Sequence, residues 1–189
     1  MCGPAECTEA DARAAFAVGR LLAARGVTVL CGGGRGVMAA AAQGARSGNG
    51  TVVGVLPGLE LSPQESPDLT VAIRTGMGQA RNVILVSSAD AVIAVGGSWG
   101  TLSEVAHAMR RGTDRPPGSF PVVSLGGWRV VDRDGRPVPG VLEARDAEHA
   151  VALALGEATD TASSDDSEGA SQRACERGAD RARNPTDTA

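Results

Sequence analysis

The 189-residue chain contains no lysine and no tyrosine, and arginine supplies all of its basic side chains. A chain without lysine cannot hold pyridoxal phosphate as an internal Schiff base, and it lacks the lysine of an ATP-binding P-loop. Both of these protein classes are therefore excluded. Arginine remains, and its planar guanidinium binds phosphate or carboxylate through two parallel hydrogen bonds.

Aromatic residues make up only 2% of the chain, so the core has to be built from valine, leucine, isoleucine and alanine. No apolar run approaches the ~20 residues that cross a membrane, and no signal peptide is recognisable. We therefore expect no membrane partner and a cytoplasmic location. The net charge of −4 provides no basic field for nucleic acid, so we expect no nucleic-acid partner either.

Clusters of cysteine and histidine are also missing. The four cysteines form no Cys-x-x-Cys pair, and the two histidines, His107 and His149, stand alone. Because metal sites of this kind need closely spaced ligands, we expect no metal site. Cys31 is interpreted as a small buried residue at a strand end.

Short apolar strands alternate with amphipathic helices over residues 1–155. Helices are expected over 9–25, 37–47, 78–87, 101–111 and 146–155, and strands over 27–31, 51–56, 71–74, 91–95, 121–125 and 141–144. This alternation predicts an α/β fold, a doubly wound Rossmann-like parallel sheet in a single domain with helices on both faces. After residue 155 the composition becomes polar and small, and we expect residues 156–189 to form a disordered tail.

The expected order lacks the first strand of such a sheet. The helix over 9–25 follows the turn Cys2-Gly3-Pro4 directly. In doubly wound sheets the first strand is central, so its absence would leave two unpaired edges in mid-sheet. We therefore expect that the chain as given is shortened and that the missing strand lies upstream of Met1.

Two glycine-rich turns follow expected strands: the first glycine turn spans residues 32–36, and the second spans residues 96–101. N–H groups at a helix start have no intrahelical acceptor and lie at the positive end of the helix dipole, so such turns bind anions. Parallel strands end at one shared edge, so the turns predict one phosphate-bearing ligand held between them. The candidate ligand-binding residues are Gly33, Gly34, Gly36, Met77, Arg81, Asn82, Gly96, Gly97, Ser98, Trp99, Gly100 and Thr101.

Arg81 and Glu104 are the candidate catalytic residues, and each has a structural alternative. Thr101 and Glu104 could form a capping box at a helix start. Alternatively, the Glu104 carboxylate faces the ligand, where it could act on a ribose hydroxyl or stabilise a cationic sugar. Arg81 starts a helix against the helix dipole, and a binding partner explains this better than a surface position. Trp99 either stacks on a ligand ring or fills a hydrophobic gap.

The segments CGGGRGVM, GVLPG, TGMGQARN and GGSWGTLSE together resemble the LOG-like branch of Rossmann-type proteins. This branch was long labelled lysine-decarboxylase-like. It includes cytokinin-activating nucleoside 5′-monophosphate phosphoribohydrolases and molybdenum-cofactor carrier proteins, and the chain most resembles the small bacterial subgroup akin to the carriers. The resemblance implies a homo-oligomer, either dimer or tetramer. It implies no required cofactor, and a phosphorylated nucleotide-like or pterin-like ligand, with the molybdenum cofactor as a candidate cargo.

The hydrolases of this branch carry the signature PGGxGTxxE, where x is any residue. In this chain Gly96 stands at the proline and Ser98 at the second glycine, while the signature is otherwise kept through Glu104. Asn82 replaces the lysine that follows the catalytic arginine, which corresponds to Arg81. These departures bear on hydrolysis more than on phosphate binding. We therefore favour binding of a phosphorylated ligand, with phosphoribohydrolase activity through Arg81 and Glu104 as the alternative.

Overall fold

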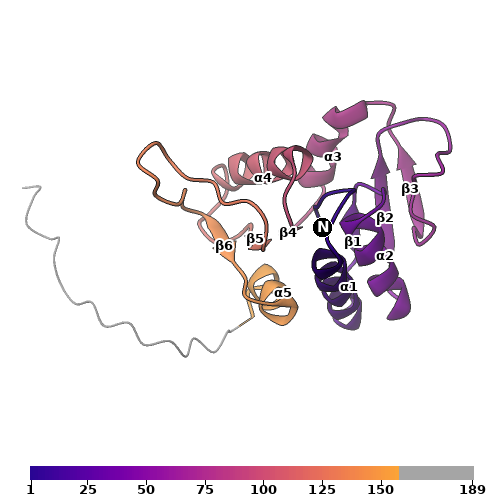
Figure 1. The fold of residues 1–189 in the computed structure, drawn as a ribbon, viewed down its shortest axis with the longest axis horizontal. Coiled ribbons are helices and arrows are strands. Elements are labelled where there is room, and N and C mark those ends of the chain that lie inside the picture. The colour runs from indigo at the N-terminus through magenta and orange to yellow at the C-terminus, as the bar shows by residue number, and fades with distance from the viewer. Residues whose placement is uncertain (158–189) are drawn as a thin grey trace, which may run out of the picture. The chain divides into compact units, whose positions relative to one another are not determined.

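The computed structural model describes residues 1–157, and most of the expected tail, residues 158–189, lies outside this part of the chain (Figure 1). The helices are α1 (Glu9–Ala24), α2 (Val37–Ser47), α3 (Arg81–Ser87), α4 (Trp99–Gly112) and α5 (Ala147–Leu155), with a short 3₁₀ helix, η1 (Gly78–Ala80), before α3. The strands are β1 (Val29–Cys31), β2 (Val52–Leu56), β3 (Val71–Arg74), β4 (Val92–Val95), β5 (Val122–Leu125) and β6 (Val141–Glu143).

Every expected helix and strand is present, although the first three residues of the helix expected over 78–87 form η1 and the start of α4 also differs. We expected this helix to begin at residue 101, but it begins at Trp99 because the Ser98 side chain caps it. The Thr101 N–H donates to the Ser98 hydroxyl at 3.2 Å. The capping box between Thr101 and Glu104 is therefore wrong, and Glu104 needs another explanation. Thr8 caps α1, and Asp11 completes a capping box with it.

All strand pairs are parallel, and they form two three-stranded sheets ordered β1-β2-β3 and β4-β5-β6. Residues 1 and 2 lie between β1 and β4, where Figure 1 marks the N-terminus. The Cys2 N–H donates to the Ile93 carbonyl at 2.9 Å, and the Met1 ammonium donates to the Leu30 carbonyl at 2.8 Å. Within residues 1–157 no strand precedes α1, as expected, and an isolated bridge between Cys2 and Ala94 stands in its place.

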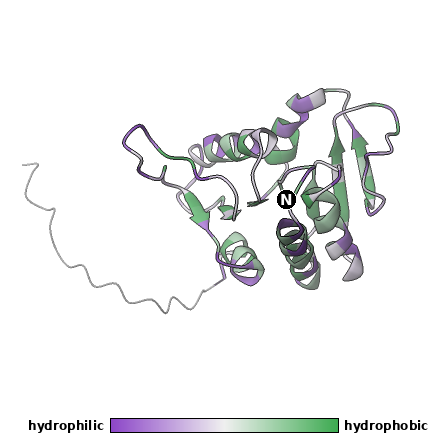
Figure 2. Ribbon diagram, in the orientation of Figure 1, coloured by the Kyte–Doolittle hydropathy of each residue, from purple (hydrophilic) through white to green (hydrophobic). Residues whose placement is uncertain are grey.

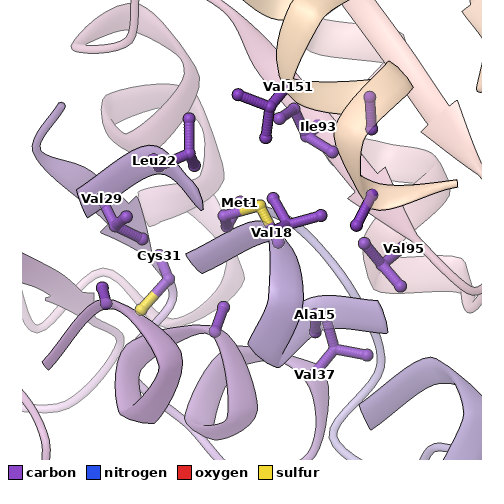
Figure 3. Close-up of a cluster of buried hydrophobic side chains, with 14 of the residues drawn as sticks. Met1, Ala15, Val18, Leu22, Val29, Cys31, Val37, Ile93, Val95 and Val151 are labelled. Atoms are coloured by element: carbon purple, nitrogen blue, oxygen red, sulfur yellow. The ribbon is translucent and has the colours of Figure 1, made fainter. Parts of the chain in front are cut away.

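Both faces of the sheets are covered by helices, which confirms the Rossmann-like α/β fold. Along β4, Ile93 and Val95 point into a core shared with α1, α2 and α5, shown in Figure 3. The alternate residues, Val92 and Ala94, pack in a second core with residues of α3 and α4. Burial on both faces explains why the central strands are apolar without alternation, as Figure 2 shows. No helix within residues 1–157 is long and apolar enough to span a membrane.

Helices α1 and α2 approach each other so closely that glycine is required on both. A Cβ atom at Gly19 would lie 2.1 Å from the carbonyl oxygen of Ala41, and one at Gly44 would lie 2.0 Å from that of Phe16. Real Cβ atoms do not approach backbone oxygens this closely. The two helix backbones are therefore in direct contact.

We expect Gly19→Ala to destabilise the protein, although alanine is the better helix former by about 1 kcal/mol. The added methyl group would force α1 and α2 apart, and such overpacking costs about 1–3 kcal/mol. Gly112→Ala, at the end of α4, is the matched control because its Cβ would meet nothing closer than 4.0 Å. Urea unfolding of both variants measures the effect, and equal stability of Gly19→Ala and the parent would contradict it.

Candidate functional site

The first glycine turn is packed against protein backbone. The Val37 N–H, at the start of α2, donates to the Pro4 carbonyl at 3.1 Å. A Cβ atom at Gly36 would lie 2.4 Å from the carbonyl oxygens of both Pro4 and Ala5. At Gly33 an added Cβ would lie 2.4 Å from a methyl group of Leu56. Close packing therefore accounts for these two glycines without a ligand.

The second glycine turn has a more open helix start. Ser98 caps α4, so the N–H groups of Trp99 and Gly100 are left without an intrahelical acceptor. Gly96 adopts φ = 66°, which proline cannot reach because its ring holds φ near −65°. The backbone of this turn therefore differs from any that carries proline at the same position.

A cavity of about 410 Å³ lies beside the second glycine turn. Its wall is formed by the turn, by α4, by the ends of β4 and β5, and by β6 and the loop before it. The lining residues that matter below are Gly96, Gly97, Ser98, Thr101, Trp128, Arg129 and Glu143. The Arg129 guanidinium pairs with the Glu143 carboxylate, with Nε 2.9 Å from Oε1, and the two side chains remain 65% and 58% exposed.

The loop that follows β5 forms part of the cavity wall and packs on the second glycine turn. A Cβ at Gly97 would lie 2.5 Å from Cδ1 of Trp128, and a Cβ at Gly127 would lie 2.2 Å from the Gly96 carbonyl oxygen. The Trp128 ring meets the Trp99 ring edge to face, with centroids 4.9 Å apart and planes at 82°. Trp99 is 78% exposed, so the expectation that it fills a hydrophobic gap is wrong.

The Arg81 guanidinium acts electrostatically on the Glu104 carboxyl, but neither residue lines the cavity. Arg81 is 7% exposed, and its Nε donates to the Val55 carbonyl at 2.9 Å, so the alternative of a surface arginine is wrong. Its guanidinium lies over Gly32, where a Cβ would be 2.7 Å from Nη2. Glu104 is 5% exposed, in the neighbourhood of Cys2.

Burial dominates the electrostatics of this pair. Desolvation raises the pKa of the Glu104 carboxyl above its ordinary value, while the Met1 ammonium and the Arg81 guanidinium oppose the rise. Desolvation also raises the pKa of the Cys2 thiol, and the negative charge of Glu104 adds to that effect. The expectation that Cys31 is a buried strand-end residue is confirmed, since it is fully buried at the end of β1.

Asn82, which replaces the lysine of the hydrolases, is 2% exposed. Its Nδ2 donates to the Ser103 hydroxyl at 3.2 Å, whereas its Oδ1 has no hydrogen-bond partner among residues 1–157. Met77 is half-exposed, just before η1. In the part of the chain that the structure describes, no three His, Cys, Asp or Glu residues are grouped as a metal site would need.

The cavity brings together only part of the expected site. It contains four of the candidate residues: Gly96, Gly97, Ser98 and Thr101. The candidates outside its wall are Gly33, Gly34, Gly36, Met77, Arg81, Asn82, Trp99 and Gly100. Sequence reasoning missed Trp128, Arg129 and Glu143. One signal was available, because a glycine pair, Gly126-Gly127, follows β5 just as Gly96-Gly97 follows β4.

We expect Glu104→Gln to flatten the pH dependence of stability. A carboxyl with a raised folded-state pKa stabilises the fold fully below its unfolded pKa, near 4.5, and this contribution is lost as pH rises through the folded pKa. The parent should therefore lose up to about 1.4 kcal/mol per pH unit in that window relative to the variant, whose amide does not titrate. Denaturant unfolding between pH 4 and about pH 8 measures this difference.

Glu9→Gln is the control for this measurement, because the Glu9 side chain is 84% exposed in a surface ion pair with Arg13. It should keep the pH dependence of the parent. If Glu104→Gln also keeps the parental slope, the Glu104 carboxyl does not carry a raised pKa.

Comparison with known proteins shows the family to which the chain belongs. The profile of the SLOG cluster4 family matches residues 1–114. A probable cytokinin riboside 5′-monophosphate phosphoribohydrolase of Oryza sativa subsp. japonica is 33% identical over 98 residues, which cover 51% of this chain and 43% of the rice protein. The chain thus spans less than half the length of that relative.

Two solved structures are similar over most of their length. The molybdenum cofactor binding protein of Rippkaea orientalis has 34% identity and a TM-score of 0.68, with 82% of this chain and 93% of that chain covered. The molybdenum cofactor carrier protein of Chlamydomonas reinhardtii has 31% identity and a TM-score of 0.67, with the same coverage of 82% and 93%. The chain belongs to the SLOG cluster4 family, within the LOG-like Rossmann-type proteins and close to the molybdenum-cofactor carriers.

Proposed function

We propose that the chain binds a small phosphorylated ligand of the pterin type, with the molybdenum cofactor as cargo, in the cavity beside the second glycine turn. One observation carries the proposal: Ser98 and Thr101 at the start of α4 line the cavity, and the N–H groups of Trp99 and Gly100 lie between these two residues in the chain, while the candidate catalytic pair lies outside the wall. A volume of about 410 Å³ lies within the range of small-molecule sites. The similarity to the cofactor-binding protein of Rippkaea orientalis supports the choice of ligand.

The residues around the cavity fit the chemistry of such a ligand. The N–H groups of Trp99 and Gly100 suit a phosphate, because they lie at the positive end of the α4 dipole. Arg129 also lines the cavity, and its guanidinium could exchange the Glu143 carboxylate for the phosphate. Two tryptophans at the edge suit a planar ring. The cofactor is cargo here, and the roles we assign to this chain are to bind it and hold it in place.

Hydrolysis of a nucleoside 5′-monophosphate is the second candidate, since Arg81 and Glu104 lie near each other and a rice relative is named for that activity. Three observations weigh against it. Glu104 is 95% buried outside the cavity, Arg81 is held by the Val55 carbonyl, and Gly96 has a conformation that the proline of the hydrolase signature cannot adopt. The burial of Glu104, the hydrogen bond of Arg81 and the conformation of Gly96 would all have to change before a nucleotide could contact Arg81 and Glu104.

Several further expectations belong to this proposal. The family resemblance favours a homo-oligomer, and a cofactor carrier would act in the cytoplasm. Residues 1–155 would form the binding domain, with residues 156–189 as a tail.

The purified full-length chain, expressed in a bacterium that makes the molybdenum cofactor, should carry a pterin. Denaturation followed by oxidation converts the released pterin to a fluorescent product that chromatography quantifies. We expect close to one pterin and one phosphate per chain. A chain that carries no pterin, and that binds no added pterin monophosphate in calorimetry, would overturn the proposal.

The hydrolase alternative has its own test. Incubation with AMP should release no adenine above a no-protein control. Adenine release that disappears in Glu104→Gln, in a variant that still folds, would establish the enzyme in place of the carrier.

We expect Arg129→Ala to weaken binding of pterin monophosphate by about tenfold, since charge-assisted hydrogen bonds contribute about 1.5–3 kcal/mol and this one is partly exposed. Glu143→Gln should have the opposite effect, because it removes the carboxylate that pairs with Arg129. Calorimetry at two salt concentrations measures both. Arg110→Ala is the control, since Arg110 pairs with Asp114 on the surface of α4 outside the cavity wall. If Arg129→Ala binds as the parent does, Arg129 is not a ligand contact.

A further inference from the structure

The only two tryptophans of the chain lie in contact at the edge of the cavity. Trp99 is the first residue of α4, and Trp128 lies in the loop after β5. Their rings meet at 82° with centroids 4.9 Å apart. In an edge-to-face pair, one ring turns its edge to its partner, so at least one further indole face is left open to a third ring.

The position of Trp128 is fixed by the second glycine turn. Its ring lies where a Cβ of Gly97 would be, and the preceding residue, Gly127, packs on the Gly96 carbonyl. Any larger residue at 97 or 127 would push the ring away. Trp128 is therefore a preformed part of the cavity wall, and it supports Trp99 from one side.

Trp99 is the unusual member of the pair because it is 78% exposed. Burial of a tryptophan normally contributes strongly to folding, and this side chain forgoes most of that contribution. Its N–H group belongs to the same open helix start that suits a phosphate. The exposed indole and the anion-binding backbone are thus parts of one residue, at the edge of one cavity.

We propose that Trp99 and Trp128 form an aromatic recognition element that selects a planar fused-ring ligand. The ring of the ligand stacks on the indole face of Trp99, with Trp128 holding that indole in place, while the phosphate lies at the start of α4. This inference rests on the proposed binding function and adds to it the residue that determines ring specificity. A sugar phosphate has no planar aromatic ring to stack on the indole, so it would gain only the phosphate contact.

Calorimetry with two probes, 6-hydroxymethylpterin monophosphate and ribose 5-phosphate, tests the element on the full-length chain. We expect Trp99→Leu to weaken binding of the pterin probe by about tenfold or more, the usual effect of losing a stacking partner. Trp99→Phe should stay within about threefold of the parent, because it keeps an aromatic plane. Ribose 5-phosphate should bind the parent and both variants alike. Leu61→Ala, at a side chain that is 84% exposed elsewhere, is the control.

Tryptophan fluorescence gives an independent readout. In Trp128→Phe the emission comes from Trp99 alone, since the chain has no tyrosine and no other tryptophan. Stacking of the pterin probe should quench this emission, and ribose 5-phosphate should not.

The outcomes separate the inference from the function on which it rests. Equal binding of the pterin probe by Trp99→Leu and the parent would overturn the inference and leave the proposed function standing. Equal binding of both probes by the parent would overturn it too, since the ring would then contribute nothing. If the parent binds neither probe, the proposed function fails, and the inference fails with it.

Discussion

The contact between the second glycine turn and the loop after β5 is the interaction on which the site depends. It extends the pairing of β4 with β5, since the Gly96 N–H donates to the Leu125 carbonyl at 3.2 Å just beyond both strands. The absence of side chains at Gly97 and Gly127 then lets the two backbones and the Trp128 ring meet directly. These contacts hold the loop against the second glycine turn in the protein without a ligand.

The two positions at which this turn departs from the hydrolase signature have distinct physical consequences. Gly96 adopts a positive φ, which proline cannot adopt. The backbone after β4 therefore follows a path that a turn with proline at this position could not follow. Ser98 supplies a hydroxyl that caps the Thr101 N–H, where glycine would leave that N–H available to a phosphate. Under the proposed function, the N–H groups left for a phosphate are those of Trp99 and Gly100.

The sequence predicted the fold because its signals are local. Apolar strands and amphipathic helices are each encoded within a few residues, and all those expected are present. The site was predicted less completely because its wall is made by segments distant in sequence. Trp128 and Arg129 lie in a loop without periodicity, and only the pairing of β4 with β5 brings that loop to the second glycine turn. The first glycine turn is ambiguous in sequence, since tight packing and ligand approach both require glycine.

Arg81 and Glu104 match the hydrolase signature in sequence, yet both are buried and lie outside the cavity wall. A carboxylate that activates water has to be ionised and reachable, but burial favours the neutral form of Glu104 and places the side chain behind the cavity wall. Arg81 offsets part of that desolvation and anchors β2 through the Val55 carbonyl. Under the proposed function the pair would support the carboxyl ends of the central strands, while the ligand binds one strand further along the sheet. A carrier benefits from this separation, because its cargo can be held by backbone N–H groups and aromatic faces without meeting a group that could react with it.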